Sequence, residues 1–594
     1  MPETKRIRWF DWAVFAVLAA LCNLVFQQAD ILHTGGASFA YLNGHITDFY
    51  SYTNSTIGGC RYMPTTYILF AVWNLPLKLL GLKTDVSMAA TLPVQLWYTG
   101  LPILAYAGIA VVMFRLALLM GFSEKKARIA AYAFAASPIA FFSQFIIGQY
   151  DSLTLFFVML GVYYYFKDDT VRFVLFFSVA MTCKYFALLI FVPMVLLKEK
   201  KVWPILRQGV CFMLLFAAET AFYLQDKAMA VNIIGFNATG YIFNVALDTG
   251  TNFPKISLVI LVWGSLCAWA FFTNPENLLS RWKWFLYLES LVMFCVFGLS
   301  MWHPQWVMLA VPFLGFGTMM HKRNDIFWLL DLGMMLAFVW FTEYGWPNNL
   351  DQALMRQGIL NDLIGPRYFS GLTMESFYSY SRSIPFSVLS GLFLINTLFK
   401  HPKYQIESPE ADTDPQIGLL RARFLAGIAL FLVPCAVCLF TMLRGPYALS
   451  EHVANAISPD YVIALQDEKG SRELEQYFRP DRDTVERIDV KFDGYEHTEG
   501  GDVLITMVDT TAKKTVKELR LPRSAIVSPA AHHITFDPVP VDPSHRYKLV
   551  FSCDPAGSDY LGVYYDPADV PKAFQVAVDG KRKRFSLAVD VFGR

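Results

Sequence analysis

Long apolar runs follow one another along most of the 594-residue chain. An α-helix needs about 20 apolar residues to cross a bilayer. About thirteen runs approach or reach that length, and polar residues separate them. The runs are 9–29, 97–119, 129–147, 152–166, 172–183, 185–197, 206–225, 255–273, 284–302, 306–320, 325–342, 383–399 and 424–443. This pattern predicts an α-helical polytopic membrane protein with about 13 spans.

Two apolar stretches do not fit a simple crossing. Residues 66–82 are interrupted by Pro76, and we expect them to form a re-entrant or interfacial helix on the outer face. The stretch 172–197 is broken near Lys184 into two short runs. It therefore predicts a hairpin that does not fully cross the membrane.

The pattern changes at about residue 445. From there apolar and polar residues alternate over short runs, and turn residues such as Asp493-Gly494 and Asp579-Gly580 separate them. The expected strands are 485–492, 502–508, 547–553, 561–565, 574–578 and 585–591. Short alternating strands with this punctuation predict an antiparallel β-sandwich. We therefore expect a membrane domain over 1–444 and an all-β domain, carbohydrate-binding-like, over 445–594.

Positive charge gives the expected orientation. Lys and Arg cluster in alternate loops, for example at 125–128, 198–201 and 322–323. Such clusters favour the cytoplasmic side. The N-terminus is therefore predicted to be cytoplasmic, and an odd number of spans places the C-terminal domain outside the cytoplasm. The membrane would be the plasma membrane if the chain is bacterial. Three outer loops are long, 30–96, 226–254 and 343–382, and long loops on a rigid scaffold usually carry function.

Composition agrees with a membrane protein. Hydrophobic residues make up 55% of the chain and charged residues 17%, against about 25% charged in a soluble domain. The formal net charge is +1, which gives no reason to expect a nucleic-acid partner. Seven of the nine cysteines lie in apolar runs, where packing is their expected role. Cys60 and Cys553 lie in polar segments and could pair, although sequence alone does not establish a bridge.

The first candidate for chemistry is Asp48, in the first outer loop. Aromatic residues including Tyr52 follow it, and Arg61 comes shortly after. A carboxylate framed by aromatics and close to a cation suits a general base. The alternative is a turn aspartate among aromatics that lie at the membrane interface.

Two further candidates lie directly before the fourth span and within the broken stretch. Gln149, Tyr150 and Asp151 precede the fourth span. Asp151 either takes part in chemistry or serves only as the N-cap of the helix that begins there. Lys184 lies in an apolar context and needs a partner, for which an anionic head group is natural. The alternative is a lysine that extends its ammonium to the interface.

Polar residues also follow the ninth span. His303 and Gln305 lie between Trp302 and Trp306, where they either bind phosphate or belong to an interfacial aromatic belt. Three carboxylates fall within predicted spans and match no motif, and paired structural carboxylates are the expectation for them. They are Glu219, Glu289 and Asp331.

These motifs, in this order and topology, resemble the GT-C superfamily of polytopic glycosyltransferases that use lipid-phosphate sugars. The segment around Asp48 is similar to the first-loop acidic motif of that superfamily. The runs GQYDSLTLFFVMLGVYYYF and VAMTCKYFALLIFVPMVLL resemble mannosyltransferase-like members, and WHPQWVMLAVPFL resembles their later outer-edge motif. The resemblance covers about residues 1–400. One departure is Ile46, which stands where a DxD pair would need a second acid. A metal-independent reaction is therefore favoured, although a divalent cation stays possible.

The resemblance implies an inverting transfer of a hexose or pentose at the outer face. The donor would be a polyprenyl-phosphate sugar, with its tail among the membrane lipids, and the acceptor a glycan or a lipid-linked glycan. Asp48 would act as the base, and Asp151 would hold the acceptor or donor sugar or assist the base. The donor or its phosphate would be bound by Lys184, His303, Arg61, Tyr52, Gln149, Tyr150 and Gln305.

Two other classes of function stay open. A transporter or flippase of lipid-linked glycans would place its charged residues near the midplane, in repeated halves, and neither pattern is evident here. A receptor or wall-binding protein would use the β-sandwich and leave Asp48 without a role.

Overall fold

The chain forms a helical unit and a β unit, as its computed structural model shows. It describes residues 7–593 except 234–239, 241–244, 249, 251–254, 301, 346–358, 361–382, 410–414, 445–446, 450–452, 454–460, 468–469, 481, 495–500, 527–529, 555–559 and 567–574. By packing, the helical unit extends through Cys435 and the β unit begins at Ala436. The predicted domain boundary lies after Arg444, the last residue of helix α23.

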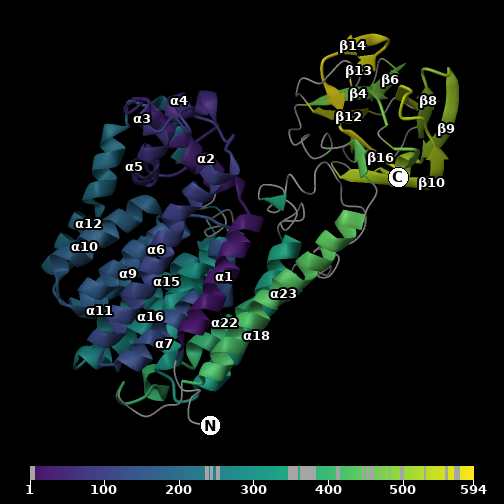
Figure 1. The fold of residues 1–594 in the computed structure, drawn as a ribbon. Coiled ribbons are helices and arrows are strands. Elements are labelled where there is room, and N and C mark those ends of the chain that lie inside the picture. Colours follow the sequence, from purple (N-terminus) through teal and green to yellow (C-terminus); the bar gives the residue numbers. More distant parts are fainter. Residues whose placement is uncertain are drawn as a thin grey trace. The chain divides into compact units, whose positions relative to one another are not determined.

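Every run predicted as a span contains a helix (Figure 1). The helices are α1 (Trp9–Val25), α6 (Leu92–Leu119), α7 (Glu124–Ala135), α9 (Asp151–Phe166), α10 (Thr170–Cys183), α11 (Phe186–Lys198), α12 (Val202–Phe222), α15 (Leu258–Phe272), α16 (Leu278–Phe297), α17 (Val311–Met319), α18 (Asn324–Gly345), α22 (Ser383–Leu398) and α23 (Ile417–Arg444). By length and composition, four helices in the described part of the chain are able to cross a membrane, or up to six if each bent pair counts as one span. The predicted polytopic helical fold is confirmed, and the number of spans stays a prediction.

Chain breaks explain why several of these helices are short. Pro138 begins helix α8 (Pro138–Phe141), and its ring cannot continue α7 without a clash. The two segments, with the π-helix η1 (Phe142–Ile146) that follows, are bent by 51°. Lys184 has extended backbone angles and ends α10, and α11 begins at Phe186. The predicted break at Lys184 is therefore present.

The segment 30–96, predicted to be the first outer loop, is compact and largely helical. It contains α2 (Ala29–Ala37), α3 (Phe39–Leu42), α4 (Phe49–Thr56) and α5 (Pro64–Leu79), the last being the segment expected to be re-entrant or interfacial. Buried aromatic residues hold them together, among them Phe49, Tyr50, Tyr67 and Tyr98. In Figure 1 these helices gather at one end of the helical unit, and α7 lies at the other.

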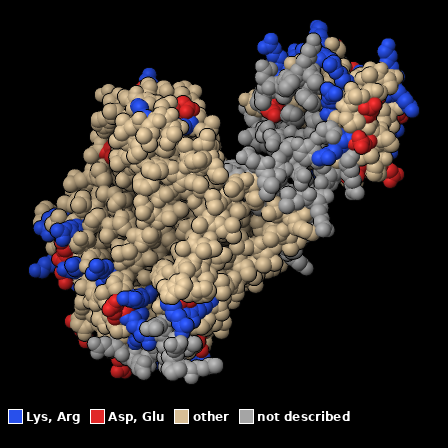
Figure 2. All heavy atoms as spheres, in the orientation of Figure 1, with Lys and Arg blue, Asp and Glu red and all other residues tan. Residues whose placement is uncertain are grey.

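Charge separates the two ends of the helical unit. Figure 2 shows Lys and Arg gathered near the end where α7 and α11 lie, whereas the middle of the visible face is almost uncharged. A broad uncharged band between polar ends is what a lipid-facing surface requires. The chain is thus a multi-pass integral membrane protein, and the cytoplasmic location of the Lys- and Arg-rich end stays a prediction.

The β unit is a pair of antiparallel sheets around one apolar core, as predicted. One sheet has the order β3 (Tyr447–Leu449), β16 (Val589–Gly593), β7 (Thr484–Asp493), β12 (Leu561–Asp566), β4 (Val462–Asp467), β5 (Gly470–Ser471), with β10 (Ala531–Pro540) on β7 and β15 (Ser586–Leu587) on β12. The other has the order β14 (Lys581–Lys583), β13 (Val576–Val578), β6 (Leu474–Phe478), β11 (Tyr547–Cys553), β8 (Val503–Asp509), β9 (Lys514–Leu521). Residues from both sheets, such as Ile488 and Leu549, form the core.

The cysteines are free thiols. Cys60 is buried in the core of the first outer loop and Cys553 in the core of the β unit. The bridge that sequence left open between them is therefore absent from this structure.

Candidate active site

A cavity of about 960 Å³ opens at the end of the helical unit that holds α2 and α4. Four of the residues singled out from sequence line it, and they come from three segments far apart in the chain. They are Arg61, Tyr150, His303 and Gln305. Other lining residues that matter below are Asp30, His33, Tyr62 and Trp306.

Two glycine turns and a short helix position these side chains at the cavity. Gly58, at φ 97°, ends α4 and turns the chain toward Arg61, a conformation that glycine adopts without strain. Gly148, at φ 72°, makes the turn between η1 and α9 and so places Tyr150 at the cavity. The 3-10 helix η2 (Pro304–Ala310) begins directly after His303 and presents Gln305.

Asp30 is the only carboxylate among the described residues that line the cavity. It lies in the first turn of α2, and its side chain is exposed. Gln149 donates a hydrogen bond to its carboxylate, and Gln305 donates one of 2.7 Å to the side-chain oxygen of Gln149. Gln149 itself is buried and does not line the cavity. It instead links Asp30 to Gln305.

The sequence interpretation missed Asp30. The residue comes directly after the first apolar run, where it reads as the polar end of a span. A signal was present, because His33 follows one helical turn later and both side chains then share one face of α2.

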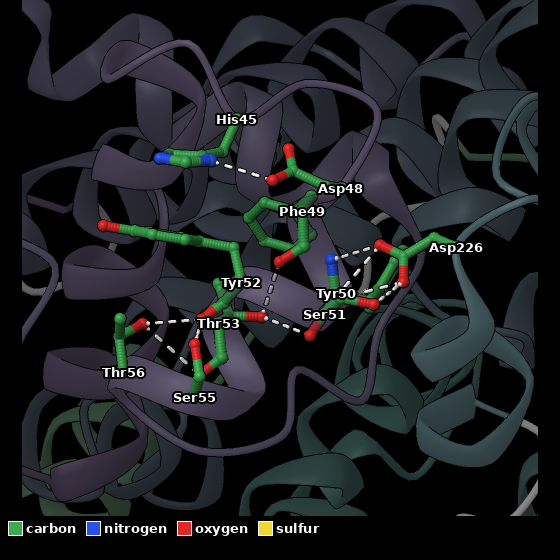
Figure 3. A network of polar contacts seen from close by, with 10 residues as sticks. All are labelled: His45, Asp48, Phe49, Tyr50, Ser51, Tyr52, Thr53, Ser55, Thr56 and Asp226. Atoms are coloured by element: carbon green, nitrogen blue, oxygen red, sulfur yellow. Dashed lines mark hydrogen bonds and ion pairs between the residues drawn. The ribbon is translucent and has the colours of Figure 1, made fainter.

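Asp48 lies outside the described lining of the cavity. It is the N-cap residue of α4, whose other end carries Asn54 and Ile57 to the cavity wall. Its carboxylate is 2.9 Å from Nδ1 of His45 and is largely exposed. The ring of His45 stacks on Tyr52 with 3.5 Å between centroids (Figure 3). Asp48 and Tyr52 therefore share His45 as a neighbour, and neither belongs to the described lining that includes Arg61 and His303.

Asp226 fixes the start of α4. Its carboxylate accepts the backbone N–H of Tyr50 at 2.7 Å and of Ser51 at 3.1 Å, and also the Ser51 hydroxyl (Figure 3). A carboxylate at the first turn satisfies donors that the helix leaves unpaired and interacts favourably with the helix dipole. The residue directly before α13 (Lys227–Ile233) thereby holds the segment that carries Asp48.

Lys184 and Asp151 form a buried ion pair. The Lys184 ammonium binds Oδ1 of Asp151, and their side chains are 4% and 0% exposed. The ammonium also lies 5.3, 5.2 and 5.6 Å from the ring centroids of Tyr62, Tyr150 and Trp306. Neither member of the pair lines the cavity, but all three rings do.

The cationic side of the cavity consists of Arg61 and two histidines, His33 and His303. Burial, and then the nearby charge of Lys184, lowers the pKa of His303. At neutral pH His303 is thus an uncharged imidazole that donates or accepts a hydrogen bond. Arg61, with an exposed side chain, is then the permanent positive charge of the lining.

The described residues contain no group of three or more His, Cys, Asp or Glu side chains arranged to hold a metal ion. In the cavity lining, Asp30 would have to bind a divalent cation without a second carboxylate. Hard cations such as Mg²⁺ prefer several oxygen ligands. The donor set of this cavity fits such an ion poorly.

No protein-family model matches the chain, and no curated protein matches its sequence. Among solved structures it is similar to ArnT from Cupriavidus metallidurans, in a crystal structure bound to undecaprenyl phosphate. The two sequences are 12% identical and the TM-score is 0.32. The match covers 70% of this chain and 77% of the ArnT chain. It is also similar to the arabinosyltransferase EmbB from Mycobacterium smegmatis, with 11% identity, 92% and 64% covered, and a TM-score of 0.30. At these values the similarity carries no argument about the superfamily, and the resemblance to the GT-C superfamily rests on the sequence motifs. Such low values say nothing about donor or acceptor.

Proposed function

We propose that the chain is an inverting glycosyltransferase that moves a hexose or pentose from a polyprenyl-phosphate donor to a glycan or lipid-linked acceptor. The observation that supports this most is the cavity, which sets one exposed carboxylate, Asp30, among Arg61, His303 and an aromatic wall. It lies at the end of the helical unit remote from the Lys- and Arg-rich end. That position suits a substrate whose tail stays in the membrane and whose phosphate lies at the outer face.

The reaction needs one base and one anion site. The acceptor hydroxyl attacks the anomeric carbon, the bond from that carbon to the phosphate oxygen breaks, and the hydroxyl proton passes to a carboxylate. Phosphate leaves without a strong general acid, so a single displacement suffices, and it inverts the anomeric centre. Arg61 stabilises the charge that develops on the phosphate, and the neutral imidazole of His303 adds a hydrogen bond.

Two aspartates compete for the role of base. Asp48 matches the superfamily motif, whereas Asp30 faces the cavity and is held by the Gln149–Gln305 link. Because a base must reach the proton it removes, we propose Asp30 for this role. In this proposal Asp48, with His45, contacts the acceptor outside the described lining of the cavity, at the start of α4. Lys184 is left out of the phosphate site, since Asp151 already binds its ammonium.

Matched variants test the proposal. Purified protein in proteoliposomes is given polyprenyl-phosphate mannose, glucose or arabinose, and transfer is measured with and without EDTA. Asp30→Asn should lower kcat by about 100-fold or more, because general base catalysis contributes about 10²–10⁴-fold. Asp48→Asn should raise KM for the acceptor with a smaller change in kcat. The control is Asp85→Asn, an exposed aspartate of the same loop whose contacts are with Lys83 and Ser87.

The outcomes separate the candidates. A loss of kcat confined to Asp48→Asn would restore Asp48 as the base and remove Asp30. Full activity in both variants would refute a carboxylate base from this loop. Loss of transfer in EDTA, restored by a divalent cation, would assign the metal requirement that the donor set argues against.

A further inference from the structure

Lys184 is the shared contact of three rings that come from three different parts of the chain. Tyr62 precedes α5, Tyr150 is the N-cap of α9, and Trp306 lies in η2. Their centroids lie within 5.2–5.6 Å of the Lys184 ammonium. A cation at this distance is attracted to the electron-rich face of an aromatic ring, and more strongly where water is excluded. One ammonium therefore fixes the relative positions of three rings that line the cavity.

The ring contacts among these residues complete the wall. Tyr62 meets Tyr150 edge to face at 5.4 Å, and Trp306 packs on Phe186 at 4.9 Å and on His303 at 4.9 Å. Phe186 lies two residues after Lys184, at the start of α11. The break at Lys184 thus supplies both the cation behind the wall and one of the rings that support it.

The charge of Lys184 is not available to a phosphate. Its counter-ion Asp151 is buried with it, so the pair is neutral as a unit. Two polar atoms of this cluster, Oδ2 of Asp151 and Nε1 of Trp306, are buried without a hydrogen-bond partner among the described residues. Buried polar atoms without partners are rare, and where they persist they call for an explanation beyond packing.

We infer that the Lys184–Asp151 pair is a positioning device that holds Tyr62, Tyr150 and Trp306 as a platform for the sugar ring of the donor. Aromatic faces are electron-rich and complement the C–H bonds on the faces of a sugar ring. The phosphate then lies toward Arg61, which also lines the cavity and directly precedes Tyr62 in the chain. This inference rests on the proposed function, because it assumes a donor that carries both a sugar and a phosphate.

The experiment separates binding of the sugar from binding of the phosphate. Full-length protein in nanodiscs is titrated with undecaprenyl phosphate, which lacks the sugar, and with the undecaprenyl-phosphate sugar that the wild type uses. Lys184→Met should leave the Kd for undecaprenyl phosphate within about threefold of the wild-type value. It should raise the Kd for the sugar-bearing lipid about tenfold or more, because the variant loses two or three contacts between the ammonium and the rings. Lys184→Arg keeps a cation and an ion pair, and should restore most of the difference.

A second variant guards against misfolding. Lys184→Met leaves Asp151 buried alone, which is strongly destabilising, whereas Lys184→Met with Asp151→Asn removes both charges. The double variant should recover thermal stability but still discriminate poorly between the two lipids. Asp151→Asn alone should not tighten undecaprenyl phosphate, because the ammonium is not directed at the phosphate.

Three results would overturn the inference. The first is an equal loss of affinity for both lipids in Lys184→Met, and the second is no loss of affinity for either lipid in that variant. The third is tighter binding of undecaprenyl phosphate by Asp151→Asn. The first and third results would place Lys184 on the phosphate. Failure of the wild type to bind either lipid, or to transfer any sugar, would instead refute the proposed function.

Discussion

Replacing Arg423 by Met should destabilise the helical unit far more than replacing any exposed arginine. Arg423 lies on α23 and is 2% exposed. Its Nη1 donates to Asp331 of α18 at 2.8 Å, and its Nη2 donates to the Ala133 carbonyl, at the end of α7, at 2.7 Å. The guanidinium also lies 4.6 Å from the ring centroid of Trp328. One side chain thus joins three helices.

The contacts set the size of the effect. Removing one partner of a buried ion pair costs about 3–5 kcal/mol, because the other charge stays buried. Asp331 then keeps the 2.8 Å hydrogen bond from Asn396, and the Ala133 carbonyl loses a donor worth about 1 kcal/mol. We therefore expect about 4 kcal/mol for Arg423→Met, and less for Asp331→Asn, which leaves Arg423 its carbonyl and ring contacts. The double variant should show a coupling of about 1–3 kcal/mol.

The assay is reversible unfolding of the purified protein in mixed micelles, followed by tryptophan fluorescence. Arg323→Met is the matched control, because Arg323 makes a two-bond contact with Asp325 at 3.0 and 2.9 Å but is exposed. An exposed pair contributes little to stability, because water and salt screen its charges. Equal losses for Arg423→Met and Arg323→Met, or strict additivity in the double variant, would refute the reasoning.

Two further predictions concern other parts of the chain. Asp226→Ala should loosen α4 by about 1 kcal/mol, the usual value of a helix cap, and should speed hydrogen exchange over residues 49–56; unchanged exchange there would contradict it. In the β unit, a hydrogen bond to Asp509 at 2.7 Å raises the pKa of His545 above its ordinary value of 6.5. Because the pKa of His545 is then higher in the folded than in the unfolded protein, the pair contributes its full share to the free energy of unfolding below that ordinary value. This contribution is lost as the pH rises through the raised pKa. Unfolding of the full-length protein between about pH 6 and about pH 9 should show this decline, and His545→Gln should remove it.

The membrane architecture was predictable because run length is a direct consequence of bilayer thickness. Each predicted apolar run holds a helix, and even the break at Lys184 was visible as a lysine in an apolar stretch. Exact bounds were not predictable. The run 129–147 contains Pro138, which divides it into two bent segments, and such a bend depends on the packing around it.

The β unit shows where periodicity fails. Strands with one buried face, such as β8 and β11, alternate strictly and were predicted. β4, β6, β9 and β10 were not among the expected strands, and in β9 and β10 the apolar alternation is weak because both are mostly exposed. β10 also contains Pro538 and Pro540, which argue against a strand in sequence although an edge strand tolerates them.

The candidate site was predictable in its motifs and not in its contacts. Sequence drew attention to Arg61, Tyr150, His303 and Gln305, and the fold brings these four to one cavity. It could not place Asp48 at the far end of α4, because that depends on where the helix begins. Nor did it assign Asp151 as the partner of Lys184, since the two lie 33 residues apart and meet only through the packing of α9 against α10.

The charges of the cavity give a reason for its single carboxylate. With Lys184 neutralised by Asp151, the permanent charges of the described lining are Arg61 and, when ionised, Asp30. A bound phosphodiester donor adds one negative charge, and the phosphomonoester that leaves carries about two. If Asp30 accepts the acceptor proton in the same step, it loses one negative charge as the phosphate gains one. In the proposed transfer the net charge of the cavity is then unchanged, so the reaction does not build up charge in the cavity. A second, unprotonated carboxylate in the lining would not alter this change, but its constant negative charge would oppose binding of the phosphate, whereas a neutral ion pair behind the aromatic wall does not.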